Sequence, residues 1–119
     1  FAAIDALAGV LRIDPKDTQA LLAMADLSFS NQAFPKAADF YRRYLELKPD
    51  DLDTRARYGS AIAFTGKYDE AAKELERVLE VDPKHFQAAA YLAVTYARKG
   101  EKDRSRSQAE AALRLAPNE

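Results

Sequence analysis

The chain contains no cysteine and only one histidine, His85, among its 119 residues. Without cysteine it can form no disulfide, no thiolate nucleophile and no cysteine-ligated zinc site. One histidine cannot build a multi-histidine metal site, and a catalytic relay would have this residue as its only imidazole. The four glycines are scattered along the chain, so there is no glycine-rich phosphate loop. These absences predict a protein that is not an enzyme and that uses no metal and no cofactor.

Neither sign of charge dominates the chain, because 18 lysines and arginines stand against 19 aspartates and glutamates, for a formal net charge of −1. A chain without a net basic field does not attract nucleic acid, so nucleic acid is not an expected partner. No apolar run approaches the roughly 20 residues of a membrane span, so direct membrane insertion is not expected. The chain starts at Phe1 and has no signal-like segment, which leaves its location unknown, with cytoplasm and periplasm both allowed.

What the sequence does contain is one stretch that occurs four times. Its first copy reads Leu11-Arg12-Ile13-Asp14-Pro15, and the later copies end at Pro49, Pro83 and Pro117. The prolines are 34 residues apart each time (49−15, 83−49, 117−83), and a fixed period of this length indicates a stacked array of repeats. Each copy has the pattern of the last turn of an amphipathic helix, stopped by a residue that cannot continue it.

Apolar residues at helical spacing fill the segments between these prolines. The first stripe consists of Ala3, Leu7, Val10 and Leu11 and predicts a helix over residues 1–14. Small residues recur at positions 25, 59 and 93, with bulky ones beside them at 24, 58 and 92, which is how a helical hairpin reaches interior packing density. The pattern predicts an all-α chain of about seven helices, which include segments near 18–31, 52–65 and 69–82.

Several residues at the predicted helix ends are interpreted as caps. Asp17 and Asp51 are residues of a good N-cap type, and His85 occupies the same column of the repeat. We therefore interpret His85 as a cap or loop residue and not as a catalytic one. Gly66 is of the type that closes a helix.

These columns resemble the tetratricopeptide repeat, whose pattern W-x₂-L-G-x₂-Y…A-x₃-F…P spans one such period. The best copy contains Tyr58-Gly59, the turn Gly66-Lys67-Tyr68-Asp69-Glu70-Ala71, and then Leu75, Leu79 and Pro83. The resemblance covers the whole chain and implies an α-solenoid of antiparallel helix pairs in a single domain. Its expected parts are the second helix of a partial repeat (1–17) and three full repeats (18–51, 52–85 and 86–119).

The chain departs from the family pattern in its first column, which usually holds a large aromatic residue. Leu21, Arg55 and Ala89 stand there instead. We therefore expect the start of each first helix to be less anchored than is usual in the family. In the last unit Ser105 replaces alanine, as expected of a terminal repeat that acts as a cap.

The resemblance also implies a binding site, because in this family the first helix of each pair lines a concave groove. Helical spacing independently places positions 22, 26 and 29 on one stripe, and likewise 56, 60 and 63, and 90, 94 and 97. The label "concave" comes from the resemblance alone. The predicted groove residues are Gln19, Leu22, Asp26, Phe29, Asp53, Ala56, Ser60, Ala63, Phe64, Gln87, Ala90, Val94, Ala97 and Arg98.

The chemistry of these positions excludes one known mode of binding and favours another. Chaperone-binding members grip a C-terminal carboxylate with lysine, asparagine and arginine, but the corresponding columns here hold residues of other types (Leu22/Asp26, Ala56/Ser60 and Ala90/Val94). What remains is a small-residue, apolar floor with Phe29 and Phe64 on it. We hypothesise that it binds an apolar segment of another protein, either extended or as an amphipathic helix. The alternative is that Phe29 and Phe64 pack against the neighbouring repeat.

A second interface is expected at the start of the chain. The helix at 1–14 lacks its own hairpin partner, which would leave Phe1 and Ile4 partly bare. Exposed apolar surface of this kind tends to be covered, so we expect either a helix upstream in the native chain or self-association through this half repeat.

Three functions fit these observations. The leading one is a non-catalytic scaffold that binds another protein or peptide. The second is a structural or homo-oligomerisation segment of a larger assembly, such as one in the bacterial envelope. The third is the recruiting arm of an enzyme whose catalytic domain lies outside these residues.

Overall fold

The computed structural model describes residues 2–116, which form seven α-helices and no strand. The all-α prediction is therefore confirmed for this part of the chain. Phe1 and Pro117, which belong to the predictions above, lie outside the described residues. The helices are α1 (Ala2–Ile13), α2 (Thr18–Ser30), α3 (Phe34–Leu47), α4 (Leu52–Phe64), α5 (Tyr68–Val81), α6 (Phe86–Lys99) and α7 (Lys102–Leu115).

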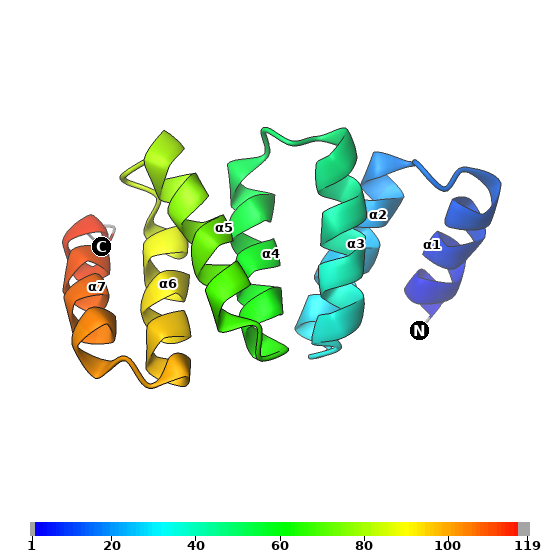
Figure 1. The fold of residues 1–119 in the computed structure, drawn as a ribbon. Coiled ribbons are helices and arrows are strands. Elements are labelled where there is room, and N and C mark those ends of the chain that lie inside the picture. Colours follow the sequence, from blue (N-terminus) through cyan, green and yellow to red (C-terminus); the bar gives the residue numbers. More distant parts are fainter. Residues whose placement is uncertain (1, 117–119) are drawn as a thin grey trace.

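The helices stack in chain order as a solenoid. The hairpins α2/α3, α4/α5 and α6/α7 each pack internally, and α3 then packs on α4 and α5 on α6. Among the first helices, α4 and α6 pack closely against each other, whereas α2 and α4 do not. Helix α1 packs on α2, and α1 and α7 lie at opposite ends of the array (Figure 1). The predicted α-solenoid is therefore confirmed.

The predicted caps hold the first helix of each hairpin. The side chains of Asp17, Asp51 and His85 accept the backbone N–H groups of Ala20, Thr54 and Ala88 at 3.0, 3.1 and 3.1 Å. The turns inside the hairpins also repeat, because Gln32, Gly66 and Gly100 occupy one column and all have left-handed backbone (φ 61°, 93° and 93°). Helix α4 ends at Phe64 with Thr65 as its C-cap, and Gly66 follows this cap, so it closes the helix as predicted.

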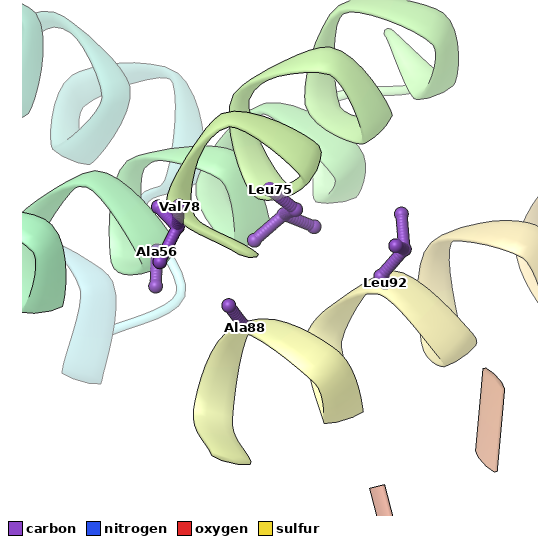
Figure 2. Packing of buried hydrophobic residues seen from close by; sticks show 5 residues of the cluster. All are labelled: Ala56, Leu75, Val78, Ala88 and Leu92. Atoms are coloured by element: carbon purple, nitrogen blue, oxygen red, sulfur yellow. The ribbon is translucent and has the colours of Figure 1, made fainter. Parts of the chain in front are cut away.

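The core of the array lies between successive hairpins. Figure 2 shows its central part, in which side chains of α4, α5 and α6 converge. All of them are buried: Ala56, Leu75, Val78, Ala88 and Leu92. Because the cluster draws on two hairpins, no single repeat could bury these residues alone.

The residues in the first column of the repeat pattern are anchored in the structure, although none of them is a large aromatic residue. Leu21 and Ala89 are buried. Arg55 donates to a carboxylate oxygen of Glu74 at 2.9 Å and to the carbonyl oxygen of Pro49 at 3.1 Å. An ion pair of two largely buried side chains thus ties the start of α4 to α5.

The recurring stretch before each proline is only partly a packing element. Its first apolar residue is buried or half-buried in the first three copies, as with Leu45. Its second apolar residue is exposed in those same copies, at Ile13, Leu47 and Val81. The two apolar positions therefore do not share one packed face. Residues two apart in a helix do not share a face, so only the first can reach the core.

The close approach of α4 and α5 gives a testable prediction about Gly59. A Cβ atom there would lie 2.8 Å from Cγ of Leu75, so Gly59→Ala should lower the free energy of unfolding by about 1–3 kcal/mol through overpacking. At Gly9 in α1, a Cβ atom would meet only an arginine nitrogen at 3.6 Å. Gly9→Ala should therefore raise that free energy, by about 0.5–1 kcal/mol. Urea titration of both variants checks this, and effects of equal sign would contradict it.

Burial within the array predicts a contrast between two leucines on second helices. Leu75 is 0% exposed and Leu113 is 73% exposed. Leu75→Ala should reduce the free energy of unfolding by about 2–5 kcal/mol, whereas Leu113→Ala should change it by less than about 0.5 kcal/mol. Denaturant titration of the two variants measures both values, and similar losses would contradict the packing described above.

Candidate functional site

The predicted groove residues lie on α2, α4 and α6, whose shared surface we call the α2–α4–α6 face. Most of them offer surface to a partner. The exposed ones are Gln19, Asp53, Phe64, Gln87, Val94, Ala97 and Arg98, and the half-buried ones are Leu22, Asp26, Phe29 and Ala90. The face is therefore accessible along its length, although not at every predicted position.

Three predicted groove residues, Ala56, Ser60 and Ala63, are buried in the array. Ala56 belongs to the core cluster with Ala88 and Leu92 of the next hairpin, whereas Ala63 clusters with Ile62 and Ala71 of its own hairpin. In this structure all three residues serve packing and present no surface to a ligand. The residues one repeat later, Ala90, Val94 and Ala97, stay open because α7 is the last helix that the structure describes.

Two residues of this face were missed by the sequence reasoning, namely Arg57 and Tyr91. Each follows a predicted groove residue by four positions, Asp53 in α4 and Gln87 in α6, and each is half-buried. Residues four apart share a helix face. That spacing alone was a sufficient signal to include them.

A polar cluster crosses the face between the first two hairpins. The carboxylate of Asp26 accepts a hydrogen bond from the Tyr41 hydroxyl at 2.6 Å and one from Arg57 at 3.3 Å. Burial, together with the hydrogen bond to Asp26, raises the pKa of Tyr41 far above its ordinary value, so this hydroxyl remains a donor. Asp26 and Arg57 both remain partly exposed and keep capacity for further hydrogen bonds.

A row of aromatic side chains lies beside this cluster. Phe29 meets Phe34 edge to face, with ring centroids 5.4 Å apart, and Phe34 stacks on Phe64 at 4.4 Å. The guanidinium of Arg98 lies 4.7 Å from the centroid of Phe64. Phe64 therefore packs against both neighbouring repeats, whereas Phe29 packs against Phe34 and Tyr41 of its own repeat. Both predicted phenylalanines also keep part of their surface, and Phe64 is 36% exposed.

His85 is held in a structural role between two hairpins. Its Nδ1 accepts the backbone N–H of Ala88, so the ring proton is on Nε2, which donates to Asp53 at 2.7 Å. The side chain is largely buried. Both ring nitrogens are thus occupied, as the cap interpretation predicts. Within residues 2–116 no group of three or more histidine, aspartate or glutamate side chains could hold a metal ion.

A hollow of about 340 Å³ lies between α3, α4 and α5 over Tyr58 and Ile62, away from the α2–α4–α6 face. Its rim is charged, and part of that charge is already paired, as between Asp39 and Arg42 at 2.7 Å. The helices described here are all too short or too polar to span a membrane.

Comparison with known proteins identifies the family to which this architecture corresponds. A family model described as tetratricopeptide repeat matches residues 2–51 and 59–119. A TPR repeat-containing protein of Rhizobium etli is 29% identical over 80 residues, which are 67% of this chain and 39% of that protein. A TPR repeat-containing thioredoxin of Arabidopsis thaliana is 28% identical over 109 residues, covering 82% of this chain and 16% of that protein. A peroxisomal targeting signal receptor of Eremothecium gossypii is 31% identical over 83 residues, covering 70% of this chain and 14% of the receptor. The chain thus spans well under half the length of these relatives.

Solved structures agree in fold. A structure of MamA (MSR-1) superposes with a TM-score of 0.85 at 19% identity, covering 94% of this chain and 64% of MamA. A second MamA structure (AMB-1) gives a TM-score of 0.86 at 20% identity, with 94% and 66% covered. At such low identity these likenesses establish the fold alone. Because the family model covers most of the sequence and the helices stack as paired repeats, the chain belongs to the tetratricopeptide repeat family.

Proposed function

We propose that this chain is a non-catalytic interaction scaffold that binds an apolar segment of another protein on its α2–α4–α6 face. The observation that carries the proposal is a set of half-exposed apolar side chains, Leu22, Phe29 and Phe64, beside the polar pair Asp26–Arg57. Apolar surface of this kind gains most from being covered by apolar atoms. The segment binds either extended or as one face of an amphipathic helix.

The face is well prepared for such a ligand. Phe64 is fixed between Phe34 and Arg98, so little side-chain entropy is lost when a partner covers its exposed edge. Asp26 can accept a hydrogen bond from the partner's backbone, and Arg57 can donate one. A free carboxylate terminus is not favoured, because Arg57 is already paired with Asp26 and the exposed Asp53 adds negative charge.

A second candidate function is that of a recruiting arm in a larger enzyme. The observation that favours it is the similarity to the TPR repeat-containing thioredoxin, of which this chain spans 16%. In that case the same face would still bind a protein, and the catalytic chemistry would belong to residues outside this chain. The structural alternative, a segment of a larger assembly, would use surfaces other than this face.

Site-specific photocrosslinking tests the proposed face. A benzophenone side chain placed at Gln19 or Gln87, both exposed on this face, should crosslink the intact protein in cells to one apolar segment of a partner. The variant Phe64→Ser should lower the crosslinking yield about fivefold, because roughly 1 kcal/mol of apolar burial is lost. Mass spectrometry of the crosslinked peptides identifies the segment and measures the yield.

The matched control is Leu47→Ser, since Leu47 and Phe64 are both 36% exposed and Leu47 lies at the end of a second helix. Leu47→Ser should leave the crosslinking yield unchanged. Circular dichroism melts of both variants verify that each is folded under the assay conditions. Equal yields from the two variants, or crosslinks of equal strength from Lys36 on α3, would refute the proposal.

A further inference from the structure

The furrow between successive second helices is open at one place in the array and filled one repeat later. The open place is the hollow of about 340 Å³ between α3 and α5, whose lining includes Arg42, Ile62 and Glu70. Their counterparts lie 34 positions later (76−42, 96−62, 104−70) and fill the furrow between α5 and α7: Glu76, Tyr96 and Arg104. The hollow lies in the middle of the array, so its opening comes from its side chains and not from an end of the chain.

In the filled furrow the ring of Tyr96 bridges the two walls. Its hydroxyl donates to a carboxylate oxygen of Glu76 on α5 at 3.4 Å, and the guanidinium of Arg104 on α7 lies 5.5 Å from the centroid of its ring. Lys99 of α6 adds an ion pair with Asp69 of α5 at 2.6 Å. One aromatic ring, held between a carboxylate and a guanidinium, therefore closes this furrow.

The open furrow has a carboxylate and a guanidinium on its walls but no ring between them. Ile62 stands where the tyrosine would be, and the charged groups have exchanged walls, with Arg42 on α3 and Glu70 on α5. Pro35 and Thr65 replace the aspartate and the lysine, so that ion pair cannot form here. Because isoleucine is shorter than tyrosine, the hollow remains above it.

Both wall groups of the hollow can still contact a ligand. In the described part of the chain the ion pairs of α5 involve Asp69, Glu74 and their basic partners, and they leave the exposed Glu70 unpaired. Arg42 pairs with two carboxylates of its own helix through Nη1 and Nη2, at 2.7 Å each. The N–H groups of a guanidinium lie in its plane, so its faces remain free to stack on an aromatic ring. The floor adds the half-buried ring of Tyr58.

We propose that a partner protein inserts a tyrosine side chain into this hollow, in the way that Tyr96 fills the next furrow. The inserted ring covers Ile62 and faces the guanidinium of Arg42, which attracts an aromatic face. Its hydroxyl donates to the carboxylate of Glu70, so tyrosine fits better than phenylalanine. The hollow lies away from the α2–α4–α6 face, so this second binding site does not depend on the function proposed above.

NMR titration of the 119-residue chain with N-acetyltyrosinamide tests the proposal. This compound should shift the δ1-methyl signal of Ile62, while the other two isoleucines, Ile4 and Ile13 on α1, serve as internal references. N-acetylphenylalaninamide should bind about threefold more weakly, because it cannot donate to Glu70. Glu70→Ala should remove that difference, and since Glu70 is exposed its replacement leaves the core intact.

A pair of tyrosine variants shows whether the hollow itself is the site. Ile62→Tyr places a ring in the furrow and should abolish the shifts that N-acetyltyrosinamide causes at the Lys67 amide on the rim. Val81→Tyr, the matched control, adds a tyrosine on α5 outside the hollow, where the valine is 71% exposed, and should leave those shifts unchanged. The dispersion of the amide spectrum verifies that both variants are folded.

Three results would overturn the proposal. The first is an Ile62 signal in the wild type that does not move up to the solubility limit of N-acetyltyrosinamide. The second is equal binding of the tyrosine and phenylalanine compounds, and the third is a shift at the Lys67 amide that persists in folded Ile62→Tyr. If Ile62→Tyr does not fold, the comparison of the two compounds on Glu70→Ala still decides the question. Lys36 does not line the hollow, so the crosslinking control described above is independent of these results.

Discussion

The structure depends on the close approach of neighbouring helices, which small residues in fixed columns make possible. Gly59 lies against Leu75 with no room for a methyl group, and Ala56 and Ala88 let α4 and α6 touch. These contacts set the distance and the rotation of each hairpin relative to the next. The exposure of the other side chains depends on this placement, including that of the side chains on the proposed binding face. A change in one small residue therefore alters packing first and binding only as a consequence.

Contacts between hairpins also occupy some of the charged and aromatic side chains that could otherwise contact a ligand. Asp26 of the first hairpin forms an ion pair with Arg57 of the second. Phe64 of the second hairpin contacts the guanidinium of Arg98, which belongs to the third. Asp53 likewise holds His85. A face whose polar groups are already paired binds less by charge and more by its remaining apolar edges. It is also rigid before a partner arrives, which lowers the entropic cost of binding. In the proposed mode of binding, stability and recognition thus draw on the same residues.

Much of the fold could be predicted from the sequence, because period, spacing and caps are local properties. The 34-residue period, Asp17, Asp51 and His85 as caps, and Gly66 as a helix end all appear in the structure as expected. The residues of the candidate site could be predicted less well from the sequence. Spacing showed that positions 56, 60 and 63 share a stripe, but not that this stripe is buried in the array. The rotation of α4 against its neighbouring hairpins decides that, and no local pattern encodes it. The same rotation leaves Arg57 and Phe64 at the surface.

The column that contains Asp26, Ser60 and Val94 shows how one position controls this geometry. Ser60 is small and buried, and its helix α4 packs closely against α6. Asp26 is larger and pairs with Arg57, and there α2 and α4 stand farther apart. The separation of first helices therefore follows the side chain at this column. Val94, the third residue of the column, is 46% exposed, because no described helix packs on that side of α6. The same position of the repeat is therefore an ion-pair residue in α2, a buried packing residue in α4 and an exposed apolar residue in α6.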